Sequence, residues 1–281
     1  MDEPPIEQPP LNMFEPYVRQ WNLRADGEPI ITPGSRLLPV RHGTKPAMLK
    51  IALDAEEKIG NQLMTWWDGD GAAQVYAHAG DALLMERAEG PRSLLHMAMH
   101  GEDDEASRII CAAVARLHVP RPAPLPPLVD MRACFRSLPR AARLYGGMFE
   151  HCQHVAEHLV STPRDEAVLH GDIHHNNILD FGPRGWLAID PKRVMGERTF
   201  DYANLICNPD LPSVTDPARF TRQVRLVADV AGLERQRLLL WVLAFAGLSA
   251  AWFLEDGHQQ SAAGQLAVAK LAASAIDNGQ R

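Results

Sequence analysis

A stretch in the second half of the chain contains three oxygen-bearing side chains at a spacing that suits metal-dependent chemistry. Residues 169–191 read LHGDIHHNNILDFGPRGWLAIDP, which predicts a strand, a tight loop and a second strand. Asp172 and Asn177 belong to the loop, and Asp190 ends the second strand. An Asp can take the proton of an attacking hydroxyl, and amide and carboxylate oxygens are ligands for Mg²⁺. The stretch therefore predicts metal-assisted phosphoryl transfer, with Asp172 as the base and Asn177 and Asp190 as the metal ligands.

The three residues that begin at Asp180 read DFG, like the metal-binding triplet of protein kinases, but they follow Asn177 by only three residues. Residues 181–185 have the composition of a hairpin turn between two strands. In a kinase-type site the second metal ligand follows a complete hairpin, which favours Asp190, thirteen residues after Asn177. We therefore expect Asp180 to be a solvated turn residue.

Histidines flank Asp172 on both sides, so a zinc hydrolase is an alternative. A zinc site of this type needs further His or Asp ligands from other strand ends. The downstream sequence supplies Asp190 but no His until His258, which disfavours this alternative. We expect His170 instead to hydrogen-bond backbone groups and fix the shape of the loop. His174 either lines the substrate cleft or is exposed without a function.

The same stretch resembles the catalytic core of the aminoglycoside phosphotransferases, a family related to the protein kinases. It is most similar to the branch that contains streptomycin 6-phosphotransferases and hydroxyurea phosphotransferases. The matching positions are His170, Gly171, Asp172 and Asn177 in the loop, residues 189–191, most of residues 196–204, and residues 67–73 further upstream. With weaker matches between them, the resemblance covers nearly the whole chain after about residue 11.

This resemblance implies an α+β protein with a two-lobed, protein-kinase-like fold, in which a small N-terminal antiparallel sheet with one helix precedes a larger, mainly helical C-terminal lobe. It implies an enzyme that uses ATP and Mg²⁺ to move the γ-phosphoryl group to a hydroxyl of an aminoglycoside-like, streptomycin-type substrate, and so confers antibiotic resistance. One alternative is a kinase of hydroxyurea or of another small hydroxylated metabolite. Another is a kinase-fold protein that binds a small ligand without catalysis, against which the intact Asp172, Asn177 and Asp190 argue.

A lysine stands in the middle of an apolar run near the N-terminus. Residues 47–51 read AMLKI, which predicts a strand that contains Lys50. An ammonium group in such a strand needs an anionic partner, which in a kinase fold is the α- and β-phosphates of ATP. Residues 54–67 have helical periodicity, and we expect Glu57 to hold Lys50 in place, with Glu56 as the second choice. Acidic residues in the first turn of a helix also interact favourably with the helix dipole. This interaction is an alternative explanation for the presence of Glu56 or Glu57 at these positions.

Changes in composition along the chain predict where its parts begin and end. Four prolines and three acidic residues occur within the first ten positions, which is typical of a disordered tail. About five short strands are expected before residue 86, and mainly helices after residue 91. The predicted division is a disordered tail at 1–10, an N-terminal lobe for the nucleotide phosphates at 11–85, a hinge at 86–91, and a helical lobe with the catalytic loop and the substrate site at 92–281.

Further residues are expected to bind the nucleotide. Gly34 and Ser35, in a turn of the first hairpin, would offer backbone N–H groups to the phosphates. Backbone groups of the hinge, at Glu86 and Ala88, would pair with adenine. No GxGxxG or Walker sequence occurs in the chain, which excludes a Rossmann or P-loop assignment.

Two interpretations apply to each of the candidate acidic residues after the catalytic stretch. The resemblance implies that Asp201, near the start of a helix, braces the catalytic loop by accepting its backbone N–H groups, and a helix N-cap is the alternative. Glu197, Glu255 and Asp256 are candidates to line a cleft for cationic amines, or else belong to the solvated surface.

Composition and charge limit the possible partners. A formal net charge of −7 argues against nucleic acid and agrees with a cationic or polar small-molecule substrate. The four cysteines are scattered singly, so reduced thiols are expected. No run of about 20 uncharged apolar residues and no basic, apolar leader is evident, so we expect a cytoplasmic protein without a membrane segment. We expect a monomer or a weak dimer.

Overall fold

A six-stranded antiparallel sheet forms the N-terminal lobe in the computed structural model, which describes residues 13–209 and 211–279. The strand order is β1-β3-β4-β6-β5, and β2 pairs with β3. The strands are β1 (Leu23–Ala25), β2 (Ile30–Ile31), β3 (Ser35–His42), β4 (Lys45–Ala52), β5 (Val75–Ala79) and β6 (Ala82–Glu86). The sheet has one strand more than the five expected, and the expected tail at 1–10 lies outside the described residues.

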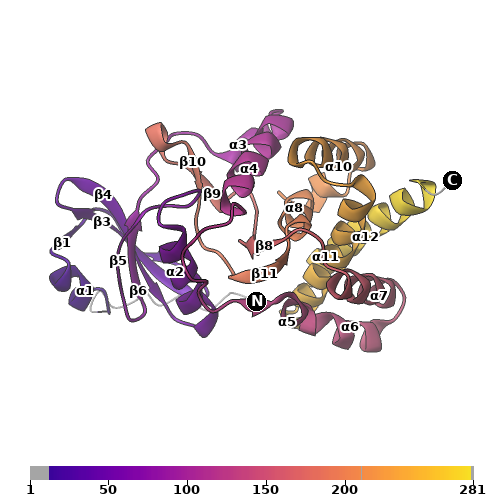
Figure 1. The fold of residues 1–281 in the computed structure, drawn as a ribbon, viewed down its shortest axis with the longest axis horizontal. Helices are drawn as coiled ribbons and strands as arrows, with labels where there is room; N and C mark the ends of the chain where they lie inside the picture. Colours follow the sequence, from indigo (N-terminus) through magenta and orange to yellow (C-terminus); the bar gives the residue numbers. More distant parts are fainter. Residues whose placement is uncertain (1–12, 210, 280–281) are drawn as a thin grey trace.

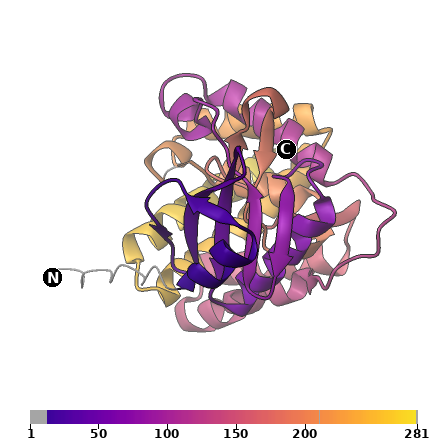
Figure 2. The same ribbon diagram turned by 90° about the vertical axis from the view of Figure 1, so that its left-hand side faces the viewer.

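Different helices cover the two faces of this sheet (Figures 1 and 2). The neighbours Leu83 and Leu84 of β6 belong to separate apolar clusters, because successive side chains of a strand point to opposite faces. The helix α2 (Ala55–Trp67) contributes to the cluster with Leu83, which continues into the second lobe. The helix α1 (Glu15–Gln20), which the sequence did not lead us to expect, follows Phe14 in the other cluster.

The connection between the lobes is held by a residue from the catalytic hairpin. β6 ends at Glu86, and the next helix, α3 (Leu94–Met99), begins eight residues later. Between them, the N–H of Gly90 donates to the backbone oxygen of Asp180 at 3.0 Å, and the N–H of Arg92 lies 3.4 Å from the Asp180 carboxylate. The expectation that Asp180 is a solvated turn residue was therefore wrong, since it is half-buried and fastens this connection.

Short strands carry the catalytic stretch between the lobes. β9 (Ile178–Asp180) and β10 (Trp186–Ala188) form an antiparallel hairpin whose turn is a short 3₁₀ helix, η3 (Gly182–Arg184). β11 (Val194–Glu197) pairs with β8 (Glu166–Leu169) and with β7 (Val129–Asp130). The N–H of Ala73 also donates to the oxygen of Ala188 at 2.9 Å, and the N–H of Ala188 donates to Gly71 at 2.9 Å. The segment after α2 is thus tied directly to β10.

The C-terminal lobe is mainly helical and packs around α11 (Figure 1). α11 contacts α12, α7 and α8, and it is the one helix among the described residues that is long and apolar enough to cross a membrane. Two thirds of its apolar window is buried inside the lobe, as in the core helix of a globular protein. The helices are α4 (Asp103–Leu117), α5 (Met131–Cys134), the 3₁₀ helix η2 (Phe135–Ser137), α6 (Leu138–Tyr145), α7 (Met148–Ser161), α8 (Thr199–Ile206), α9 (Leu211–Val214), α10 (Pro217–Ala231), α11 (Arg235–Glu255) and α12 (Gln259–Gly279). A small antiparallel sheet followed by a larger helical lobe confirms the predicted α+β architecture.

Glu197 supports this lobe and does not line a substrate cleft, so that expectation was wrong. It lies at the end of β11 and is only 2% exposed. Its carboxylate accepts hydrogen bonds from Arg237 at 2.6 Å, from the indole N–H of Trp241 at 2.7 Å and from the N–H of Arg164 at 3.1 Å. Burial alone would raise the pKa of the Glu197 carboxyl, but its bonds to Arg237 and Trp241 more than offset this and hold the pKa below the usual range. The cluster joins β11 to α11.

Replacing Glu197 with Gln should lower the free energy of unfolding by about 3 kcal/mol at neutral pH, because Arg237 would keep its buried charge without a counter-charge. Since the folded-state pKa of Glu197 lies below its unfolded value of about 4.3, the stabilisation is present above that pH and is lost as the pH falls through the folded pKa. Urea unfolding of both proteins at neutral and acidic pH measures this, and the difference should shrink in acid.

A matched control is Glu234→Gln, which removes an exposed carboxylate 2.9 Å from Arg164. Both side chains of that pair are 60% exposed, so the variant should change the stability by less than about 1 kcal/mol. Equal losses in the two variants would contradict the special role of the buried cluster.

Candidate active site

The catalytic loop is shaped by a buried histidine. His170 is fully buried, its Nε2 donates to the oxygen of Ile189 at 2.7 Å, and its Nδ1 accepts the N–H of Asp172 at 3.2 Å. Burial lowers the pKa of the His170 imidazole, so the ring is neutral and can accept on one nitrogen while donating from the other. Gly171 follows with φ of +82°, and a Cβ there would lie 2.9 Å from Val194. His170 therefore joins the loop to the end of the second catalytic strand.

A carboxylate in α8 holds the same loop from the other side. Asp201 accepts the N–H groups of His170 at 3.0 Å and of Gly171 at 2.8 Å, and His118 Nε2 donates to it at 2.8 Å. Asp201 is fully buried and lies inside α8, whose N-cap is Arg198. The carboxylate thus contacts the loop and does not cap its own helix.

The side chain of Asp172 is oriented by two amides. Asn177 Nδ2 donates to the backbone oxygen of Asp172 at 2.9 Å and to its Oδ2 at 3.3 Å, and Asn204 Nδ2 lies 3.4 Å from Oδ1. His174 is close by, with Nε2 3.7 Å from Oδ2. Sequence reasoning missed Asn204, although it follows Asp201 by three residues and so shares a helix face with it. Asp172 is half-buried and can meet a hydroxyl that enters the site.

An ion-pair cluster, to which α2 contributes Glu57, consists of two lysines and two carboxylates: Lys50, Lys192, Glu57 and Asp190. Lys50 in β4 contacts both Glu57 and Asp190, and Glu57 Oε1 also accepts from Lys192 Nζ at 2.7 Å. Asp54 starts α2 by accepting the N–H of Glu57 at 2.8 Å, which places Glu57 in the first turn beside Lys50. The side chain of Glu56 lies outside the described part. Lys192, two residues after Asp190, is a site residue that sequence reasoning missed.

The donor set at Asp190 and Asn177 fits Mg²⁺. Burial would raise the pKa of the Asp190 carboxyl, but the Lys50 ammonium outweighs this and the pKa lies below the ordinary value, so Asp190 is ionised. Asn177 is oriented by its bonds to Asp172, and its backbone oxygen accepts the N–H of Ile189 at 3.0 Å, one residue before Asp190. Mg²⁺ takes one or two protein ligands together with phosphate oxygens and water. Within 13–209 and 211–279, no group of three or more His, Cys, Asp or Glu side chains is arranged to hold a metal ion.

The expected nucleotide contacts are placed less favourably. The N–H of Ser35 donates to Thr32 Oγ1 at 3.0 Å, so this amide has a partner and does not face a phosphate. The adjacent Gly34 lies against α2, where an added Cβ would be 2.8 Å from Glu57 Cγ, and so remains close to the ion-pair cluster. The N–H of Glu86 donates to the oxygen of Gln74 at 2.8 Å and its carboxylate contacts Arg184.

In the connection after β6, Ala88 packs half-buried against the main core. Because it already donates to Gln74, the N–H of Glu86 is not available to adenine, and the adenine contacts of Glu86 and Ala88 stay a prediction.

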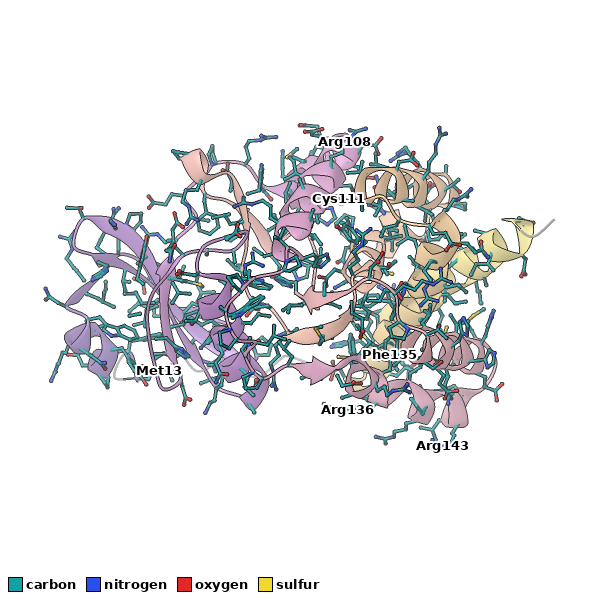
Figure 3. The ribbon with its side chains drawn as sticks, in the orientation of Figure 1. Met13, Arg108, Cys111, Phe135, Arg136 and Arg143 are labelled. Atoms are coloured by element: carbon teal, nitrogen blue, oxygen red, sulfur yellow. The ribbon has the colours of Figure 1, made fainter. Side chains whose placement is uncertain are left out.

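A cavity of about 570 Å³ opens beside Asp172 on the side of the helical lobe. Figure 3 labels Arg136, which lines it, next to Phe135. Trp252 on α11 is 38% exposed and also lines the cavity, whereas Glu255 and Asp256 are exposed one turn further on. Glu255 accepts the hydroxyl of Ser137 at 2.9 Å. The cavity wall includes Gly171, Asp172, Lys192, Arg193, Val194, Val129, Ala133, Cys134, Arg136, Phe200 and Trp252.

Comparison with known proteins assigns this chain to a family. Residues 20–257 match the family described as "Aminoglycoside/hydroxyurea antibiotic resistance kinase". A streptomycin 3''-kinase of Klebsiella pneumoniae is 48% identical over 267 residues, which cover 92% of this chain and 100% of the relative. A streptomycin 6-kinase of Streptomyces griseus is 32% identical and covers 91% of this chain and 87% of its own length.

A solved structure shares the fold at low identity. It is a thermostable mutant of the aminoglycoside phosphotransferase APH(4)-Ia in a ternary complex with AMP-PNP and hygromycin B, with a TM-score of 0.67 and 12% identity. The match covers 94% of this chain and 99% of that one. The resemblance drawn from the catalytic loop is thereby confirmed, and the chain belongs to the aminoglycoside/hydroxyurea antibiotic resistance kinases.

Proposed function

We propose that this chain is an ATP-dependent kinase that transfers the γ-phosphoryl group to a hydroxyl of streptomycin and so confers resistance to it. The observation that carries the proposal is the 48% identity to a streptomycin 3''-kinase over the whole length of that relative. The site agrees with it, because Asp172 faces a cavity while Asp190 and Lys50 lie on the nucleotide side.

The residues of the chain have distinct roles in this reaction. Asp172 accepts the proton of the hydroxyl as its oxygen bonds to the γ-phosphorus and the bond to the departing ADP oxygen breaks. Asn177 and Asp190 would hold Mg²⁺, which supplies positive charge for the phosphate oxygens. Lys50, kept in place by Glu57, binds the α- and β-phosphates, as in related kinases. His170 and Asp201 keep Asp172 in position through the loop backbone.

The size of the cavity favours a large acceptor. A volume of about 570 Å³ is in the range of pockets that hold drug-sized ligands, and it far exceeds what hydroxyurea would fill. The wall also carries the cationic side chains of Arg136, Lys192 and Arg193.

The identity of the relatives also points to one hydroxyl. The 3''-kinase is 48% identical, whereas the 6-kinases are 32% identical, so we infer transfer to the 3'' hydroxyl. We place the enzyme in the cytoplasm, where ATP is available. A monomer or weak dimer stays a prediction from the sequence.

Asp172→Asn should lower turnover of ATP and streptomycin by about 10²- to 10⁴-fold, because the amide cannot accept the hydroxyl proton. The dissociation constant of Mg²⁺-ATP should change little, since the variant keeps the backbone oxygen that accepts from Asn177 Nδ2 at 2.9 Å. Steady-state kinetics and a nucleotide titration measure the two quantities. Asp229→Asn on the exposed face of α10 makes the same chemical change as a control and should leave both unchanged. Near-native turnover of the Asp172 variant would remove it from the role of base.

Asp190→Ala should abolish the part of ATP affinity that depends on Mg²⁺, because the remaining ligand, Asn177, is a neutral amide. Calorimetric titration of ATP with Mg²⁺ and with EDTA separates this part from the affinity due to Lys50. Asp277→Ala, on the exposed surface of α12, is the control. If the variant still bound ATP more tightly with Mg²⁺ than with EDTA, Asp190 would not be a metal ligand.

Incubation with ATP and streptomycin should give a product whose phosphate is attached at the 3'' position, as two-dimensional ¹H–³¹P NMR would show. Hydroxyurea supplied in parallel should not be phosphorylated at a comparable rate. A phosphate at the 6 position would overturn the choice of hydroxyl and retain the substrate. Transfer to hydroxyurea alone would favour the alternative kinase, and nucleotide binding without transfer to either compound would favour the binding protein.

A further inference from the structure

Lys192 lies against the catalytic loop and has no role in the reaction described above. Its N–H donates to the oxygen of His170 at 2.6 Å, and a Cβ added to Gly171 would lie 3.2 Å from Lys192 Cβ. The start of the side chain is therefore fixed beside the residue that precedes Asp172. The next residue, Arg193, has φ of +52°, so the chain turns sharply at this point.

Lys192 belongs to the ion-pair cluster and also lines the cavity. Glu57 binds Lys192 through Oε1 at 2.7 Å and contacts Lys50 through Oε2. The side chain of Lys50 is 5% exposed, whereas that of Lys192 is 28% exposed and lines the cavity together with Asp172. Of the two lysine side chains that contact Glu57, that of Lys192 is therefore the more exposed, and it lies on the acceptor side.

A lysine side chain is an ammonium cation at neutral pH. Glu57 is shared with Lys50, so Lys192 has only part of one carboxylate in direct contact. A partly exposed cation with a shared partner can bind an additional anion that enters the cavity.

Phosphoryl transfer brings such an anion to this place. During the reaction negative charge spreads over the three equatorial oxygens of the γ-phosphoryl group, which passes from the nucleotide to the hydroxyl held by Asp172. Lys50 is enclosed between Glu57 and Asp190, on the nucleotide side of the cluster. Lys192 belongs to the same cluster and lines the cavity together with Asp172, which accepts the hydroxyl proton.

We propose that Lys192 is a catalytic residue whose ammonium binds the γ-phosphoryl oxygens during transfer, an inference that rests on the proposed kinase function. The bond from the acceptor oxygen to phosphorus forms as the bond from phosphorus to the ADP oxygen breaks. The hydroxyl proton goes to Asp172. Lys192 keeps its protons throughout and stabilises the charge on the equatorial oxygens, which raises kcat without a matching effect on ATP affinity.

A purely structural role predicts a different outcome. If Lys192 served only to hold Glu57, its loss would disturb Lys50 and weaken Mg²⁺-ATP binding together with turnover. The test therefore needs separate measurements of binding and of turnover, and a readout that senses contact with the γ-phosphoryl group.

Lys192→Met should lower kcat for streptomycin phosphorylation by about 10²- to 10³-fold while the dissociation constant of Mg²⁺-ATP stays within about threefold. Lys192→Arg should recover most of the lost rate, because it restores a cation. The ratio of rates with ATP and with ATPγS, which has sulfur on the γ-phosphorus, should shrink in the Met variant because the contact that distinguishes oxygen from sulfur is gone. Lys270→Met, an exposed lysine on α12, is the matched control and should match the native enzyme in each measurement.

Each outcome decides the matter. A Met variant with near-native kcat, an unchanged ratio for ATP and ATPγS, or a parallel loss of ATP affinity would overturn the proposal. If the Met variant fails to fold in a thermal unfolding test, Lys192→Gln keeps a polar partner for Glu57 without the charge, and near-native turnover there would overturn it equally. Should the native enzyme not phosphorylate streptomycin, the proposed function fails, and the same variants are then compared by release of phosphate from ATP to water.

Discussion

The fully buried carboxylate of Asp201 is the contact on which the geometry of the active site depends. It accepts two consecutive N–H groups of the catalytic loop, at His170 and Gly171, and so fixes the backbone that carries Asp172. A carboxylate buried without partners would be strongly destabilising, but here two amides and His118 satisfy it. Because Asp201 belongs to α8, the core of the helical lobe fixes the position of Asp172.

Lys50 and Glu57 belong to the N-terminal lobe, and two connections hold this lobe against the catalytic stretch. Ala73 and Gly71, in the segment after α2, form backbone bonds with Ala188 in β10. At the other end of α2, Glu57 contacts Lys192, which is bonded to the oxygen of His170 in the catalytic loop. Both ends of α2 are thus fastened to the stretch that holds Asp190. A displacement of α2 would move Glu57 away from both Lys50 and Lys192, so the ion-pair cluster and the catalytic loop depend on one arrangement.

Local sequence patterns predicted the elements and the loop, but not the partners that are distant along the chain. Lys50 was recognisable because a charge inside an apolar strand is unusual, and Asp172, Asn177 and Asp190 because their spacing matches a known chemistry. Lys192 gave no such signal, because its value comes from contacts across the fold. Asn204 could be found only from its helical spacing to Asp201. Glu197 misled for the same reason: its sequence gives no hint of Arg237 and Trp241, 40 and 44 residues away, which bury it. The prediction that Asp180 is a solvated turn residue was wrong because the turn folds back onto the connection between the lobes.

The division of labour between the loop and the cavity explains how one family serves different hydroxyls. The relatives named above are kinases of the 3'' and of the 6 position of streptomycin, so the chemistry of the loop does not by itself choose the hydroxyl. In this chain the loop contributes Gly171 and Asp172 to the cavity, while α8 and α11 contribute Phe200 and Trp252. We propose that the side chains of this wall select the acceptor, while the loop and the ion-pair cluster carry out the transfer.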